Sequence, residues 1–149
     1  MAPAVPRRTL RAALFTITAA ACAWFAGCGD SRSEPMVPVE GKVMFGGKAL
    51  TKGSVVLYPD KTRGNATKHE PRADIDADGH YKVFTHPHEG APPGWYKVAV
   101  IATEMSDPKN PYSLPRWLIP EKFGNPEQSQ LFLGVKKDAP PGAYDLALR

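Results

Sequence analysis

Short runs of alternating apolar and polar residues, separated by glycine and proline, most limit what this chain can fold into. These runs have the period and the length of β-strands. Beyond residue 28 the chain holds 14 prolines, which would interrupt most helices, and no segment there shows a helical period. The pattern predicts an all-β fold, an antiparallel β-sandwich of seven strands. The strands are expected within residues 39–45, 53–59, 72–77, 80–85, 95–102, 131–135 and 143–148.

The apolar side of each run is expected to face the core. Tyr96 and Val98 lie on one side of the most strand-like run, which directs Trp95 to the outer face or to a loop. The segment 103–127 contains five prolines and shows no clear period, so no strand is predicted there. Five runs are each expected to contribute a buried side chain: Val43, Leu57, Tyr81, Val98 and Leu146.

The stretch ADIDADGHY matches the opening of a calcium-binding EF-hand loop, with Asp74, Asp76 and Asp78 at alternate positions before Gly79. A complete loop also needs a carboxylate at position 12, where this chain has Thr85. It needs a helix on each side as well, whereas both flanking segments alternate like strands. Asp-Gly between two such runs is a strong β-hairpin signal. We therefore expect a turn rather than a calcium site.

The first 27 residues have the features of a signal peptide. Arg7, Arg8 and Arg11 stand near the start without any acidic residue, and an apolar run follows at residues 12–25. This run is shorter than the ~20 residues that a membrane-spanning helix needs. The segment 1–27 is therefore expected to direct export and to be removed.

The next residues, FAGCGDS, resemble the lipobox of bacterial lipoproteins. Ala26 and Gly27 are the small residues of that motif and Cys28 is its lipidated residue, while Phe25 departs from the usual aliphatic residue. The resemblance implies cleavage before Cys28, a diacylglyceryl group and palmitate on that residue, and attachment to a membrane surface of the bacterial cell envelope. Residues 28–38 would form a flexible tether. The other reading is an ordinary secretory signal in which Cys28 occurs by chance.

Removal of the signal peptide changes the charge of the chain. The remaining 16 basic and 15 acidic residues give a net charge of +1, whereas the whole chain has +4. The basic pI therefore comes largely from the signal peptide and gives no support for nucleic-acid binding. With Cys22 removed and Cys28 acylated, no thiol is left for a disulfide, so the apolar core must hold the domain together.

Three further stretches, in this order, resemble the carboxypeptidase regulatory-like domain, a transthyretin-like β-sandwich. They are VEGKVMFGGKALTKGSVVLYP, the hairpin DADGHYKV and the strand GAPPGWYKVAV. The segment LIPEKFGNPEQSQLFLGV is similar to the C-terminal part of that family. The resemblance implies that residues 39–149 form this sandwich, without catalysis and without a cofactor. A fold alone does not identify a partner.

No nucleophile with a base in reach and no pair of tuned carboxylates can be recognised in the sequence, so no catalytic residue is predicted. All four histidines lie between His69 and Glu89. In the segment HPHE an extended backbone would direct His86 and His88 to the same side, with His80 nearby. A divalent metal site in this region is one alternative, but no closed ligand set follows from the spacing.

Carbohydrate or peptide binding is the other alternative. Trp95 and Trp117 remain after signal cleavage, and an exposed ring beside a polar loop can stack on a sugar. The sequence thus predicts a non-catalytic, lipid-anchored β-sandwich of the bacterial cell envelope with a structural or ligand-presenting role. Its expected partners are the membrane, through Cys28, and an envelope protein or glycan.

Overall fold

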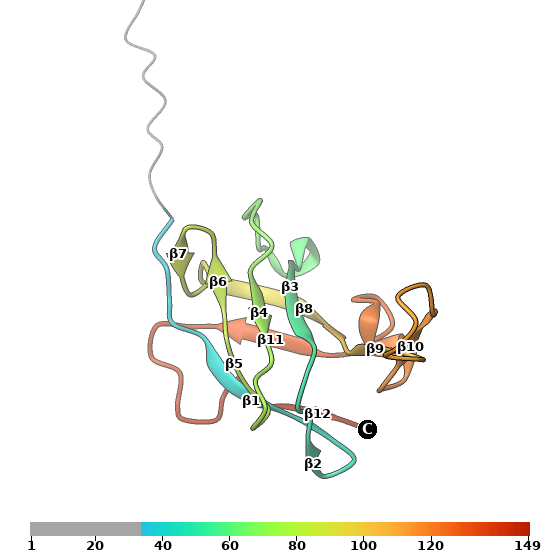
Figure 1. The fold of residues 1–149 in the computed structure, drawn as a ribbon. Coiled ribbons are helices and arrows are strands. Elements are labelled where there is room, and N and C mark those ends of the chain that lie inside the picture. The colour runs from blue at the N-terminus through green and yellow to red at the C-terminus, as the bar shows by residue number, and fades with distance from the viewer. Residues whose placement is uncertain (1–33) are drawn as a thin grey trace, which may run out of the picture. The chain divides into compact units, whose positions relative to one another are not determined.

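The computed structural model describes residues 34–149, which form strands joined by turns and two short 3₁₀ helices (Figure 1). The predicted signal peptide and the predicted lipid attachment site, Cys28, lie outside the described residues. No helix within residues 34–149 is long and apolar enough to cross a membrane. The elements are β1 (Glu40–Phe45), β2 (Lys48–Ala49), β3 (Ser54–Pro59), η1 (Lys61–Arg63), β4 (Arg72–Asp74), β5 (His80–Lys82), β6 (Phe84–Thr85), β7 (His88–Glu89), β8 (Gly94–Ile101), β9 (Thr103–Met105), β10 (Pro115–Trp117), η2 (Glu121–Gly124), β11 (Phe132–Val135) and β12 (Leu146–Leu148).

Six strands form the larger sheet, in the order β11-β8-β3-β4-β6-β7, and all neighbours in it run antiparallel. Its centre is the pair β3–β8, which extends from Ser54 opposite Ile101 to Pro59 opposite Tyr96. Both strands contain valine pairs, and β-branched side chains pack well on a pleated sheet. The alternate side chains that these two strands bury completely are Val55, Leu57, Tyr96, Val98 and Val100.

β1 is the centre of the second sheet, where it pairs antiparallel with β2 and β5 and parallel with β12. In the parallel pair Val43 lies opposite Leu146 and Phe45 lies opposite Leu148. The prediction of a purely antiparallel fold is therefore wrong at this pair. β1 and β12 come from opposite ends of the described chain, and no hairpin turn between them fixes an antiparallel direction.

The two sheets share one hydrophobic core. Side chains from β1, β5 and β12 join those of β3, β8 and β11 in a single cluster of buried residues. All five predicted core residues belong to this cluster, and none of them is more than 5% exposed. The prediction of an all-β fold with a core formed by alternate side chains is confirmed.

The described residues contain twelve strands, whereas seven were predicted. The predicted run 80–85 is divided at Val83, because β5 pairs with β1 in one sheet and β6 pairs with β4 in the other. The backbone N–H of Val83 donates to the carbonyl of Val39 at 2.9 Å. This run is therefore a corner through which the chain passes from one sheet to the other.

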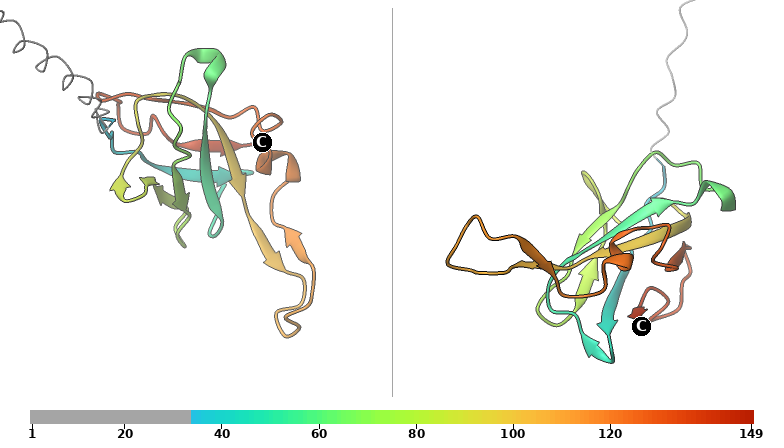
Figure 2. Two further views of the ribbon diagram at one scale, coloured as in Figure 1. Left: turned by 90° about the horizontal axis from the view of Figure 1, so that it is seen from above. Right: turned by 90° about the vertical axis from the view of Figure 1, so that its right-hand side faces the viewer.

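Two of the additional strands lie in the proline-containing segment 103–127. β9 and β10 form a two-stranded antiparallel sheet of their own there. The prolines permit this hairpin, because Pro108 and Pro111 lie in the connecting loop and Pro115 is the first residue of its strand. In the left view of Figure 2 the hairpin projects from the rest of the domain.

Contacts with the core begin before residue 39. Val37, which the sequence places in the tether, is 7% exposed and exchanges two backbone hydrogen bonds of 2.9 Å with Ala91. The hydroxyl of Thr67 donates to the carboxylate of Glu34 at 2.6 Å. The last residues of the predicted tether therefore contact the folded domain.

Candidate binding surface

The predicted outward position of Trp95 is confirmed, on the outer face of the larger sheet. Trp95 is 39% exposed and stands opposite Gly134 of β11. A side-chain carbon on Gly134 would lie 3.3 Å from the indole ring, so the absence of one lets the ring approach the strand closely. Phe132, two residues before Gly134, shares this face and is 45% exposed. Two aromatic side chains are thus presented on one face.

Arg63 of η1 connects the two rings. Its guanidinium carbon lies 4.8 Å from the centre of the Trp95 ring and 4.2 Å from the centre of the Phe132 ring. Both distances are in the range of cation–π interactions. We call Arg63, Trp95 and Phe132 the aromatic–arginine cluster.

The loop that carries Arg63 is fixed by the buried carboxylate of Asp60. One oxygen of Asp60 accepts hydrogen bonds from the hydroxyl of Thr62 at 2.5 Å and from its N–H at 3.0 Å, and the other lies 3.4 Å from the Arg63 Nε. The hydroxyl of Thr62 contributes most to lowering the pKa of Asp60. Asn65 donates to the carbonyl of Trp95 at 2.9 Å. The loop is therefore fixed both within itself and to β8.

Two depressions adjoin this loop, and both are lined by Ala66 and Thr67. The larger has a volume of about 630 Å³, and Lys97 in its wall donates to the carboxylate of Glu127 at 2.7 and 2.8 Å. The smaller has a volume of about 310 Å³ and includes Trp95. Ring faces and polar groups together are what a surface needs to bind and orient a ligand with both polar and apolar parts.

Trp117 does not belong to this surface. It lies on β10, in the separate two-stranded sheet. Its ring lies over Gly124 of η2, where an added side-chain carbon would be 2.6 Å from the ring. The two tryptophans of the described residues are therefore not brought together.

The histidine-containing segment HPHE does not have the expected extended form. Thr85 pairs with His88, so His86 and Pro87 form the turn of the β6–β7 hairpin. The expectation that His86 and His88 project to the same side of an extended segment is wrong, because the chain reverses direction between them.

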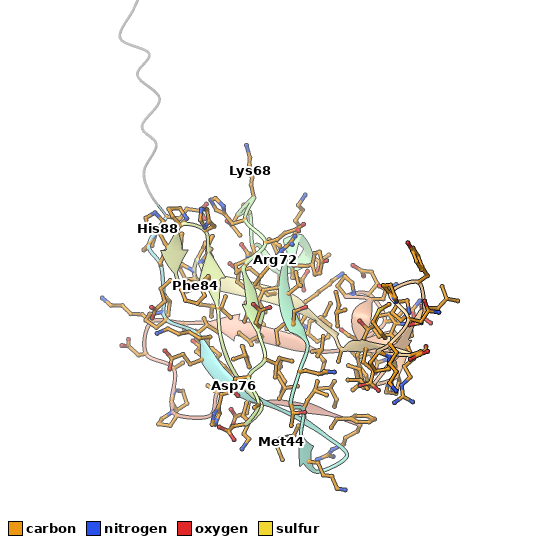
Figure 3. The ribbon with its side chains drawn as sticks, viewed as in Figure 1. Met44, Lys68, Arg72, Asp76, Phe84 and His88 are labelled. Atoms are coloured by element: carbon orange, nitrogen blue, oxygen red, sulfur yellow. The ribbon has the colours of Figure 1, made fainter. Side chains whose placement is uncertain are left out.

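Metal ligands are not gathered around the other histidines either. His80 faces Asp76, with 4.0 Å between its Nδ1 and a carboxylate oxygen. Figure 3 shows His88 and Asp76 well apart on the domain. Within residues 34–149, no three histidine, cysteine or acidic side chains are placed to hold a metal ion. The metal-binding alternative thus gains no support from the geometry.

The stretch that resembles a calcium loop forms the predicted turn between β4 and β5. One oxygen of the Asp76 carboxylate accepts hydrogen bonds from the N–H of Asp78 at 2.9 Å and from the N–H of His80 at 2.8 Å. Gly79 has a φ of 83°, in the left-handed region that glycine adopts without strain. The turn interpretation is confirmed, with Asp76 as the residue that holds it.

Ion pairs that connect strands explain the shifted pKa values of two other charged side chains in the described domain. Lys82 of β5 lies 2.7 Å from Glu89 of β7 and 3.2 Å from Glu40 of β1, and these carboxylates, Glu89 first, raise its pKa. On the 103–117 hairpin, Arg116 of β10 is the main cause of a lowered pKa for Glu104 of β9. Each of these groups therefore has a partner within the fold.

Sequence reasoning identified Trp95 but missed Phe132 and Arg63. Alternation could have found Phe132, because Leu131 and Leu133 form the apolar side of the run 131–135 and the residue between them must face outward. No comparable signal marks Arg63, because its position depends on how the loop after β3 folds over two strands.

Comparison with known proteins adds no family assignment. No family model matches the chain, and neither a curated protein nor a solved structure matches it. The resemblance to the carboxypeptidase regulatory-like domain therefore depends on the sequence motifs alone.

Proposed function

We propose that this chain is a non-catalytic, lipid-anchored protein of the bacterial cell envelope, whose β domain has a structural or ligand-presenting role. The observation that carries the proposal is the sequence Ala26-Gly27-Cys28 directly after a basic start and an apolar run. The described domain supports it, because its core begins shortly after Cys28, at Val37. A lipid on Cys28 would thus hold a domain with its own core near a membrane surface.

Replacing Cys28 by serine tests the anchor. A cysteine with two or three acyl chains is held on a bilayer almost permanently, since each buried methylene contributes ~0.8 kcal/mol. The Cys28→Ser variant should no longer be labelled by palmitate and should no longer partition into the detergent phase. The control Cys22→Ser, within the predicted signal peptide, should keep both. Equal labelling of the parent and of Cys28→Ser would show that Cys28 is not the anchor.

For the fold we propose a transthyretin-like β-sandwich of the carboxypeptidase regulatory-like type. It is supported by the core that the two sheets share and by the order of the matching stretches, which cover β1–β3, the turn between β4 and β5, and β8. A crystal structure of the protein tests the assignment. Sheets that do not face each other across Val43 and Val98 would contradict it.

The geometry of Asp60 supports a non-catalytic role. Asp60 is a buried carboxylate that lines the larger depression, and a catalytic acid or base would be expected in such a place. A general base at neutral pH works best with a pKa near 7, whereas the pKa of Asp60 is lowered by its hydrogen bonds with Thr62. Its oxygens face Thr62 and Arg63, so Asp60 holds the loop in place.

The aromatic–arginine cluster favours envelope glycan binding as a second candidate function. Two exposed rings, a guanidinium group and two adjoining depressions lie on one face of the larger sheet. Because Arg63 already contacts both rings, a sugar would stack beside the guanidinium group or displace it.

Tryptophan fluorescence tests the glycan candidate. Oligosaccharides from the envelope should quench the fluorescence of the mature protein, whose two tryptophans are Trp95 and Trp117. The quenching should disappear in Trp95→Phe and persist in the matched variant Trp117→Phe. Quenching that persists in Trp95→Phe would exclude the cluster as the glycan site.

A further inference from the structure

Several polar side chains at the tip of the 103–117 hairpin form hydrogen bonds with the backbone of the hairpin itself. The Asp107 carboxylate accepts from the N–H of Lys109 at 2.9 Å, and the Asn110 side chain accepts from the N–H of Tyr112 at 3.0 Å. The hydroxyl of Ser113 donates to the Asp107 carbonyl at 3.0 Å, and that of Ser106 donates to a carbonyl across the hairpin at 2.5 Å. These bonds order the loop before it meets any partner.

The apolar side chains of the same loop face solvent. Tyr112 is 91% exposed and Leu114 is 79% exposed, and Met105 on β9 is 41% exposed. Tyrosine is enriched among the residues that dominate binding energy at protein interfaces. A loop ordered in advance also loses little conformational entropy when its side chains become buried. The tip therefore has the properties of a preformed contact element.

A depression of about 540 Å³ lies directly beside the tip. Met105, Pro108 and Pro115 form the apolar part of its lining, and the rest is polar: Lys52, Thr103, Glu104, Ser106 and Arg116. The hairpin thus carries, next to each other, projecting apolar side chains and a hollow whose lining is partly apolar and partly polar. Two such surfaces related by a twofold axis can each accept the other, as in most homodimers.

The charges of the hairpin also suit contact between identical surfaces. Residues 103–117 contain two acidic and two basic side chains, so two copies that meet here do not repel each other. Glu104 is paired with Arg116 across the hairpin and lies 3.4 Å from Lys52. A tip that binds an anionic membrane surface would instead carry an excess of basic residues.

The hairpin lies at the opposite end of the domain from Glu34, where the described chain begins (Figures 1 and 2). We propose that the 103–117 hairpin is the surface on which a second copy of this chain docks, with Tyr112 and Leu114 of each copy in the depression of the other. Because Pro115 has no N–H and so weakens pairing of the β10 edge with another strand, we assign the contact to side chains. This inference goes beyond the proposed function and does not require the lipid anchor.

Disulfide trapping in intact cells tests the proposal with the full chain. Lys109→Cys places a thiol at the tip without removing Tyr112 or Leu114. On oxidation it should give a disulfide-linked homodimer. When two copies that carry tags of different length are produced in the same cells, a dimer of intermediate size identifies it as a homodimer. The matched variant Lys68→Cys, exposed on a loop of the main domain (Figure 3), measures random collision, and the parent measures the native cysteines.

Two changes then test whether the apolar tip is responsible. Tyr112→Ser with Leu114→Ser should reduce the Lys109→Cys dimer roughly tenfold, as expected when a dominant interface side chain is lost. Tyr112→Phe, which keeps the ring, should leave it unchanged. The proposal is overturned by equal dimer at positions 68 and 109, by dimer that survives the double serine change, or by adducts only with another protein. One further outcome overturns it: the Cys at position 109 forms no dimer, and the membrane protects it from reaction with a soluble maleimide.

Discussion

Buried tyrosine hydroxyls tie loops to the core of the domain. Tyr81 donates to the carbonyl of Tyr144 at 2.5 Å, and Tyr96 donates to the carbonyl of Pro92 at 2.8 Å. Tyr144 in turn donates to the carbonyl of Lys136 at 3.0 Å. A buried hydroxyl needs such a partner, because leaving it without one costs the free energy of its desolvation. Tyr81 and Tyr96 therefore connect irregular segments to strands, and Tyr144 connects two irregular segments.

Removal of one of these hydroxyls should lower stability. We expect Tyr81→Phe to reduce the free energy of unfolding by about 1–2 kcal/mol, because the Tyr144 carbonyl loses a donor in a buried position. The matched change Tyr58→Phe, at a partly exposed side chain whose hydroxyl bonds to no described residue, should have little effect. Urea denaturation of both variants measures the difference, and equal losses would contradict the role of the Tyr81 bond.

The same tyrosine should make stability depend on alkaline pH. Burial is the main cause of a strongly raised pKa for Tyr81, and nearby Asp145 adds to it. In the unfolded chain the group ionises near pH 10, whereas in the folded domain it stays neutral. The free energy of unfolding should therefore decrease as the pH rises above about 10. Tyr81→Phe should show a shallower decrease in urea denaturation between pH 8 and 11, and an identical slope would contradict the assignment.

Alternation predicted that Tyr81 and Tyr96 face inward, and both are buried. It could not predict their hydrogen-bond partners. The acceptor of the Tyr81 hydroxyl lies 63 residues along the chain, and a period of two contains no information about contacts between distant segments. The partners of Arg63 in the aromatic–arginine cluster were missed for the same reason.

At the scale of elements, the β4–β5 turn depends on one carboxylate. Asp76→Ala removes the acceptor of two backbone N–H groups, those of Asp78 and His80, and should lower the free energy of unfolding by about 1–2 kcal/mol. Asp74→Ala, an exposed position whose side chain bonds to no described residue, is the matched control. Thermal unfolding compares the two. A loss at Asp74 as large as that at Asp76 would mean that the turn bonds are unimportant.

Calcium should have almost no effect on this turn. Its acidic side chains do not form a ligand set, and Asp76 already accepts two backbone N–H groups. A site with a dissociation constant of ~10 μM would raise the free energy of unfolding by ~2.7 kcal/mol at a hundredfold excess of calcium. We expect the melting temperature in millimolar calcium to equal that in chelator, and a clear rise would restore the calcium interpretation.

The sequence indicates local elements better than their connections. Strands with strong alternation, such as β8, were predicted within one or two residues. β9 and β10 were missed because short strands between prolines show no period. The division of the run 80–85 into β5 and β6 was missed because both halves alternate in phase, although they pair in different sheets.

At the scale of the whole domain, residues 34–149 form a compact unit with one core. Val37 is the first residue of this core, although only the run from residue 39 shows the alternation that marks a strand. Its burial depends on Ala91, which lies just before β8 and is itself buried. The backbone pairing of Val37 with Ala91 therefore determines where the folded domain begins.

Two deletions test where the folded domain begins. A chain that starts at Glu34 keeps every described contact, so its urea midpoint should equal that of a chain that starts at Cys28. A chain that starts at Val39 loses the buried side chain of Val37, worth about 1.5–3 kcal/mol, and two backbone hydrogen bonds of about 1 kcal/mol each.

The second deletion should therefore lower the free energy of unfolding by about 3.5–5 kcal/mol, a large fraction of the stability of a domain this size. Val37→Ala in the longer chain separates the two contributions, since it keeps both backbone bonds to Ala91 and removes most of the side chain. If the chain that starts at Val39 is as stable as the one that starts at Glu34, then residues 34–38 belong to the tether, as the alternation pattern predicted.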